Sequence, residues 1–142
     1  MSFWDSSAIA PLCFNESRSQ LARLTWRGFA EHYVWSEAVV EVESSLARLT
    51  REGILTIALR SKAEKRLKFI ENEWKIVEPN QRLIDLARTF PLQYGLKAMD
   101  SLQLAAALVW CKEFTKNKNF VSADRKLLEA AEAVGFTVHD LS

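Results

Sequence analysis

The stretch FVSADRKLLEAAEAVGFTVHDL, residues 120–141, decides the fold. Its first residues form a short apolar and β-branched run that ends at an acid, which predicts a buried strand. The segment RKLLEAAEAVG then has apolar residues at helical spacing and a glycine at its end, typical of a helix and its stop signal. FTVHDL predicts a second strand. A strand, a helix and a strand in this order indicate a βαβ unit with parallel strands.

The rest of the chain repeats this alternation. Further strands are predicted at residues 2–5, 32–36 and 75–79. Helices are predicted at residues 36–53, 61–74, 80–90 and 98–111, with Ser36 and Asn80 as caps of two of them. Strands that alternate with helices predict an α/β fold with a mostly parallel sheet covered on both faces. We expect one domain over residues 1–142, because no linker or repeat interrupts the pattern.

The composition limits the class of protein to which the chain can belong. The chain has 142 residues, of which 49% are hydrophobic and 26% charged, and a net charge of +1. This balance does not by itself indicate nucleic-acid binding, so any contact with a polyanion needs a local basic surface. Cys13 and Cys111 have no pairing motif and are expected to be core residues. With no signal peptide and no long apolar run, we expect a soluble, cytoplasmic protein.

Four acids stand at comparable places in this pattern. Two follow strands, one begins the apolar helix AMDSLQLAAALVW (98–110), and one lies in the helix after the second strand: Asp5, Asp124, Asp100 and Glu41. In a parallel sheet, strand ends and the starts of the following helices meet at one edge. Clustered carboxylates raise one another's pKa unless a cation neutralises them. Oxygen ligands without His or Cys favour Mg²⁺ or Mn²⁺, and such a site suits phosphodiester hydrolysis.

Each acid also has a simpler explanation. Asp100, with Gln103 three residues later, fits a capping-box pattern. Asp124 and Asp5 could cap the helices that follow them. Glu41 caps nothing, but an exposed position is the usual one for a glutamate. Taken singly, none of the four acids distinguishes a metal site from helix capping.

The order and spacing of the motifs resemble those of PIN-domain ribonucleases, with the closest similarity to VapC-type toxins. The matching segments are FWDSSAIAPL, WSEAVVEVESSLARL, AMDSLQLAAAL and FVSADRKLLEAAEAVGFTV, which span essentially the whole chain. The resemblance implies a three-layer α/β/α sandwich and Mg²⁺- or Mn²⁺-dependent endonucleolytic cleavage of RNA. It also implies a homodimer and a cognate antitoxin protein that holds the enzyme inactive.

The resemblance assigns roles residue by residue. It makes the same four acids the catalytic and metal-binding residues: Asp5, Glu41, Asp100 and Asp124. Ser7 and Ser122 match supporting hydroxyl residues. Glu43 is the alternative to Glu41, and only one of the two can face the site, because they point about 200° apart on a helix.

Two basic residues are predicted to contact RNA because they lie near these acids in the sequence. Lys97 precedes Asp100 by three residues, and Arg125 follows Asp124 directly. Phosphate contacts from such cations would hold RNA without reading its sequence. Two other functions stay open: an RNA- or protein-binding module without turnover, and a nuclease of RNA maturation or of DNA.

Overall fold

Five parallel strands form the central sheet of the protein, whose computed structural model describes all of residues 1–142. The strands are β1 (Ser2–Trp4), β2 (His32–Trp35), β3 (Trp74–Val77), β4 (Asn119–Ser122) and β5 (Thr137–Asp140). They lie side by side in the order β3-β2-β1-β4-β5, and every neighbouring pair is parallel. The prediction of a parallel sheet is therefore confirmed.

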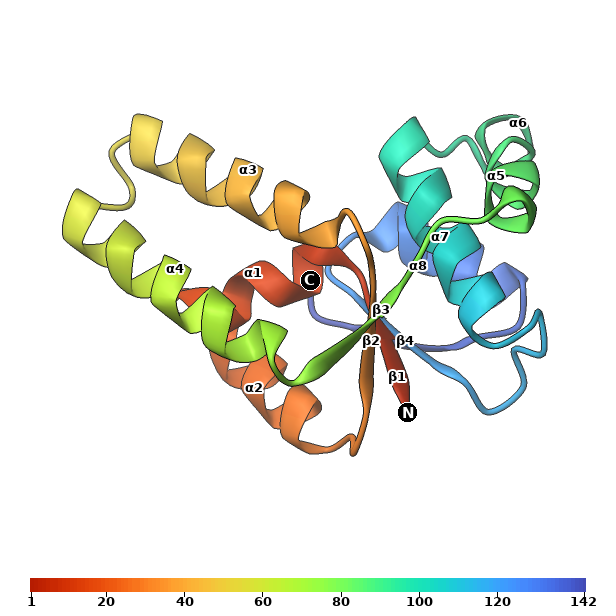
Figure 1. Cartoon of the computed structure of the whole chain (residues 1–142), viewed down its shortest axis with the longest axis horizontal. Helices are drawn as coiled ribbons and strands as arrows, with labels where there is room; N and C mark the ends of the chain where they lie inside the picture. The colour runs from red at the N-terminus through yellow and green to blue at the C-terminus, as the bar shows by residue number, and fades with distance from the viewer.

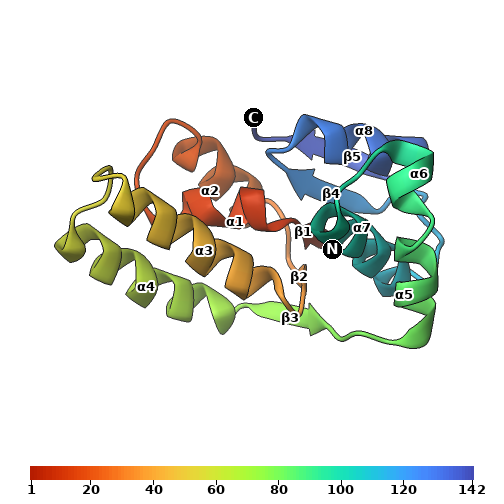
Figure 2. The same ribbon diagram turned by 90° about the horizontal axis from the view of Figure 1, so that it is seen from above.

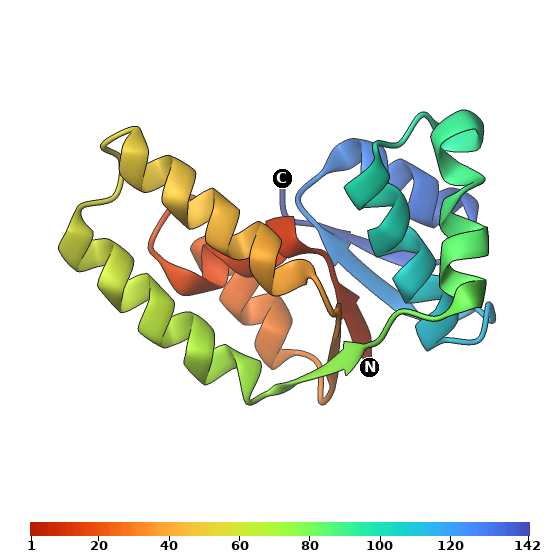
Figure 3. The ribbon, with the colours of Figure 1, turned by 45° about the horizontal axis from the view of Figure 1, so that its top comes forward.

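Helices cover both faces of this sheet. They are α1 (Ser6–Cys13), α2 (Ser19–Arg27), α3 (Ala38–Arg51), α4 (Ile57–Glu71), α5 (Gln81–Ala87), α6 (Phe90–Tyr94), α7 (Ala98–Trp110) and α8 (Arg125–Ala133). Figures 1 and 3 show α1–α4 on one side of the sheet and α5–α8 on the other. Figure 2 shows the two long helices α3 and α4 side by side. The predicted three-layer α/β/α sandwich is confirmed.

The central strand β1 explains why the first residues of the chain are apolar. Phe3 and Trp4 are completely buried, because β1 has a strand on either side and helices on both faces. The ring of Phe3 stacks on that of Phe120 in β4, with 5.6 Å between centroids. Both cysteines are free and buried, as expected of core residues. No helix is both long enough and apolar enough to span a membrane.

The path of the chain creates a crevice beside β1. From β1 the chain moves outward through β2 to β3, then returns to place β4 on the opposite side of β1. The strand order therefore reverses between β1 and β4. In open α/β sheets, ligands bind at this point, outside the carboxyl ends of the strands.

Several predicted boundaries are wrong. Ser36 does not cap α3, whose N-cap position is Glu37, and the Ser36 hydroxyl is buried without a hydrogen-bond partner. The helix predicted at 61–74 begins earlier, at Ile57 behind the Thr56 cap, and Trp74 belongs to β3. The Asn80 cap is correct, since its Oδ1 accepts a hydrogen bond from the backbone N–H of Leu83 at 2.8 Å.

Two elements of the fold were not expected from the sequence. The segment predicted as one helix at 80–90 is two, because α5 ends at Ala87 and α6 starts at Phe90, with Pro91 in its first turn. Helix α2 was not predicted. It packs on α1 and places Trp26 in the core.

Candidate active site

The four predicted acids line one cavity of about 400 Å³ at the crevice beside β1. Asp5 directly follows β1, Glu41 and Asp100 lie in the first turns of α3 and α7, and Asp124 begins α8. The cavity is also lined by Met99 and four serines: Ser6, Ser7, Ser44 and Ser45. Acids spread over 120 residues of sequence thus meet because parallel strands bring their carboxyl ends to one edge.

Asp5 is the most deeply placed of the four, with only 2% of its surface exposed. Its Oδ2 accepts hydrogen bonds from the hydroxyls of Ser7 and of Ser122, the latter at 2.8 Å. Its Oδ1 has only a longer contact, 3.4 Å, with the Ser6 hydroxyl. Burial raises the pKa of Asp5, and the two hydroxyls partly offset that rise. The hydroxyls of Ser7 and Ser122 therefore fix the orientation of this carboxylate, and Oδ1 is left available for a ligand.

Glu41 is held by two polar side chains. Gln103 Nε2 donates to its Oε1 at 2.9 Å, and the Ser6 hydroxyl donates to its Oε2 at 3.0 Å. Burial raises the pKa of Glu41, Gln103 opposes this rise, and the charge of Asp5 adds to it. Glu43 does not line the cavity and instead lies near the Cys13 thiol. Of the two candidate glutamates, Glu41 is the one that faces the other acids.

Asp100 differs from the other three because its carboxylate accepts no hydrogen bond. The N-cap position of α7 is Lys97, which has no side-chain cap, so the capping-box interpretation of Asp100 and Gln103 is wrong. Burial, and then the charges of Asp124 and Asp5, raise the pKa of Asp100 to about 6, and the charges of Lys97 and Lys126 act against this rise. A carboxylate this close to neutral pH can gain or lose a proton during a reaction.

Asp124 both caps a helix and lines the cavity. Its Oδ1 accepts a hydrogen bond from the backbone N–H of Leu127 at 3.1 Å, so it caps α8. Its own backbone N–H donates to the Ser122 hydroxyl at 3.0 Å. Because it also lines the cavity, capping does not remove it from the site.

The acids of the cavity have no ion-pair partner in direct contact, although Lys97 and Lys126 lie near Asp100. None of the four acids takes part in a salt bridge. Their donor atoms are all carboxylate oxygens, and no His or Cys lines the cavity, which fits a hard divalent cation. No three of these side chains are drawn together into a coordination sphere in this structure. The donor chemistry thus fits Mg²⁺ or Mn²⁺, although the ligand sphere is not formed.

The two predicted RNA contacts have different surroundings. Lys97 is exposed and close enough to Asp100 to lower its pKa. Arg125 turns away, and its Nε donates to the hydroxyl of Ser142 at 3.2 Å. Lys126 was not predicted as a residue of the site. Its positive charge lowers the pKa of Asp100, so it lies near the acids, where Arg125 was expected.

Two further residues of the site were not foreseen. Gln103 is completely buried and bonded to Glu41, and Ser6 bridges Glu41 and Asp5. The signal for Gln103 was present in the sequence, since it is a polar residue within the apolar helix LQLAAAL. A buried polar side chain needs a hydrogen-bond partner. The partner of Gln103 is Glu41, which lines the cavity.

The model of the PIN domain family matches residues 3–134. The chain therefore belongs to the PIN domain family, which indicates nuclease activity and use of divalent metal ions at the level of the family.

Solved structures share the fold at low sequence identity. FitAcB from Neisseria gonorrhoeae superposes with a TM-score of 0.71 at 15% identity, covering 99% of this chain and 98% of that one. A toxin–antitoxin complex from Klebsiella pneumoniae gives 0.67 at 14% identity, covering 100% and 98%. PAE2754 from Pyrobaculum aerophilum gives 0.66 at 19% identity, covering 96% and 89%. No curated protein matches the sequence.

Proposed function

We propose that the protein is a divalent-metal-dependent endoribonuclease that hydrolyses phosphodiester bonds in RNA. The observation that carries this proposal is the cavity with four carboxylates and no salt bridge to any of them. Burial and the neighbouring acids raise the pKa of Asp100, and a divalent cation would stabilise its ionised form.

The metal-binding residues would be the four acids, Asp5, Glu41, Asp100 and Asp124. A bound Mg²⁺ or Mn²⁺ would neutralise the phosphate charge and activate water. Asp5 Oδ1 is free for this role because Ser7 and Ser122 hold Oδ2. Gln103 orients Glu41 through its Oε1.

The remaining steps belong to the chain's own side chains. In the metal-free protein Asp100 has a pKa of about 6 and no hydrogen bond to its carboxylate, so it releases its proton near neutral pH when a cation binds. Lys97 and Lys126 are the cations near Asp100, and we propose that they contact the phosphates beside the cleaved bond. Arg125 Nε donates to the hydroxyl of Ser142, but its guanidinium keeps further donors, so we propose it as a further phosphate contact.

We further propose that the protein is the toxin of a toxin–antitoxin pair, acting in the cytoplasm. The support is the PIN domain and the likeness of fold to the complex from Klebsiella pneumoniae. The expected partners are an RNA substrate, a cognate antitoxin protein and a second copy of the chain. Co-expression with the neighbouring open reading frame tests the antitoxin, because a true antitoxin would copurify and suppress cleavage.

The decisive experiment measures cleavage of a panel of single-stranded RNA, tRNA and DNA with EDTA, Mg²⁺ or Mn²⁺. Asp5→Asn is run beside the wild type, and Asp85→Asn, which changes an exposed acid of α5, is the matched control. We expect metal-dependent RNA cleavage that Asp5→Asn abolishes and Asp85→Asn retains. RNA binding without cutting under any metal would indicate a binding module. Cutting of DNA alone would indicate a different nuclease.

A further inference from the structure

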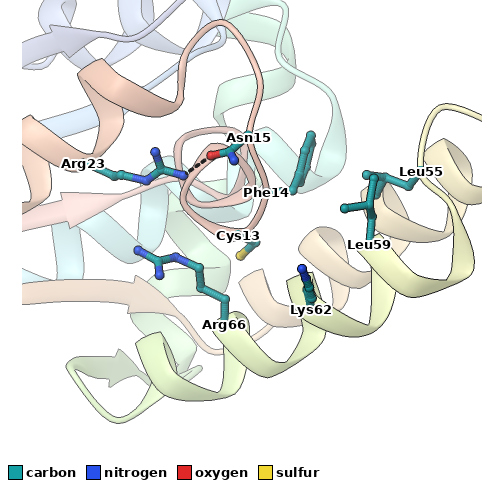
Figure 4. A pocket seen from close by; sticks show the side chains of 8 residues that line it. All are labelled: Cys13, Phe14, Asn15, Arg23, Leu55, Leu59, Lys62 and Arg66. Carbon is teal, nitrogen blue, oxygen red and sulfur yellow. Dashed lines mark hydrogen bonds between the residues drawn. The ribbon is translucent and has the colours of Figure 1, made fainter.

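A second cavity, of about 300 Å³, lies away from the acids, at the other end of α1. Asp5 precedes α1, whereas this cavity begins at Cys13, the last residue of the helix. Its walls come from the end of α1 and the loop that follows it, from α2, from the loop before α4, and from the first three turns of α4. It is lined by Cys13, Phe14, Asn15, Arg23, Leu55, Leu59, Lys62 and Arg66 (Figure 4).

Its polar lining is cationic. Arg23, Lys62 and Arg66 contribute to the wall, and no Asp or Glu does. None of the three forms a salt bridge. Arg66 Nε donates to the backbone oxygen of Leu12 at 2.8 Å, and Arg23 Nη2 donates to Asn15 Oδ1 at 2.6 Å. Because a guanidinium has five N–H donors, each arginine is anchored and still has donors to spare.

The opposite wall is apolar. Leu55, Leu59 and Phe14 contribute hydrocarbon surface, and Leu59 is 47% exposed although it is a leucine. Burial raises the pKa of the Cys13 thiol to about 12, so it is a neutral part of the floor. Figure 4 shows the two guanidinium groups on one side of the cavity and the two leucines on the other, with Lys62 and Cys13 between them. A ligand that fits has a negative head and an apolar body.

We propose that this cavity binds a small organic phosphate, with its phosphate at Arg23 and Arg66 and a ring or alkyl body against Leu55 and Leu59. Arginine is the residue whose fork of donors matches phosphate oxygens, and Lys62 adds a third positive charge. A volume near 300 Å³ lies at the lower end of the range for small-molecule sites, which favours a compact ligand over a polymer. The proposal does not depend on the proposed nuclease function.

The test is titration of the full-length protein with phenyl phosphate, followed by NMR of the leucine methyl groups and by calorimetry. We expect saturable binding that shifts the methyl signals of Leu55 and Leu59. Arg23→Gln/Lys62→Gln should weaken binding about ten-fold or more, as expected for loss of charge-assisted hydrogen bonds. The matched control, Lys65→Gln/Lys68→Gln, removes the same charge from exposed positions of α4 outside the cavity and should change the Kd less than about two-fold.

A second variant separates the two halves of the cavity. Leu59→Ser changes an exposed side chain, so the fold should be retained, and a thermal melt confirms this. It should weaken phenyl phosphate several-fold and leave inorganic phosphate unaffected. Absence of saturable binding, or equal weakening by both double variants, would overturn the proposal. Binding of a short acidic peptide in place of phenyl phosphate would overturn it as well.

Discussion

Asp100 shows how a single residue can favour activity at the expense of stability. Its half-buried carboxylate lies beside Asp124 and Asp5, accepts no hydrogen bond, and has a pKa raised from 3.8 to about 6. Between about pH 4 and pH 6 the folded chain holds a proton that the unfolded chain has released. The free energy of unfolding therefore falls as the pH rises through this window, and the loss is complete above pH 6.

Asp100→Asn should thus stabilise the metal-free protein at pH 7 and abolish cleavage. A pKa change of this size is worth ~3 kcal/mol in a dry site, and the partial exposure of Asp100 reduces it to about 1 kcal/mol. That corresponds to a Tm increase of roughly 3 °C for a chain of this length. Thermal melts in EDTA at pH 7 and pH 4 check the prediction, since the gain should vanish at the lower pH. A lower Tm at pH 7 would contradict it.

Gln103 provides a second prediction at this scale. Gln103→Leu keeps the volume of a completely buried side chain and removes the hydrogen bond to Glu41 Oε1. Without it the pKa of Glu41 should rise further, so cleavage should fall about ten-fold or more and its pH optimum should move upward. The control is Gln93→Leu, at an exposed glutamine of α6. An unchanged pH profile in Gln103→Leu would show that Gln103 does not orient Glu41.

The sequence predicted the acids of the cavity and the two hydroxyls that hold Asp5, but not the partners of Glu41. Asp5, Asp100 and Asp124 could be found because strand ends and helix starts are visible in the pattern. The interaction of Gln103 with Glu41 joins residues 62 positions apart, so it depends on how α7 and α3 lie relative to one another. The capping-box interpretation failed for the same reason, because a local pattern cannot show that a distant side chain competes for the glutamine.

At the scale of elements, Asp124 links the stability of α8 to the site. Asp124→Asn keeps an oxygen that can accept from the backbone N–H of Leu127 and removes the charge. Asp124→Ala removes both. We expect both variants to lose cleavage, with a Tm close to wild type for Asp124→Asn. For Asp124→Ala we expect a Tm about 3 °C lower, from ~1 kcal/mol of lost capping. Full activity in Asp124→Asn would mean that Asp124 only caps α8.

Helix α2 shows why one element escaped prediction. Its buried residues are Ser19, Ala22 and Trp26, whereas Leu21 and Leu24 are about half exposed. Both leucines thus lie on the outer face, and the inner face has only Trp26 beside two small residues, which hides the helical periodicity. Strands β1, β2 and β4, by contrast, were found because largely buried parallel strands give continuous apolar runs.

At the scale of the whole molecule, the clustered carboxylates should make overall stability depend on divalent cations. At an Mg²⁺ or Mn²⁺ concentration 100-fold above the Kd, binding contributes about 2.7 kcal/mol. A Tm increase of roughly 8 °C at pH 7 is then expected for a chain of this size. Asp5→Asn/Asp100→Asn should lose this increase, and Asp85→Asn should retain it. An equal increase from NaCl of matched ionic strength would contradict a specific metal site.

The position of β4 between β1 and β5 has a consequence for protein synthesis. The first two acids belong to elements made early, but Asp124 and the Ser122 hydroxyl that holds Asp5 are encoded in the last quarter of the chain. Because chains fold from the amino terminus during translation, β1 stays an unpaired edge on one side until β4 has been made. A nascent chain that lacks β4 and the start of α8 would therefore carry no assembled four-acid cavity.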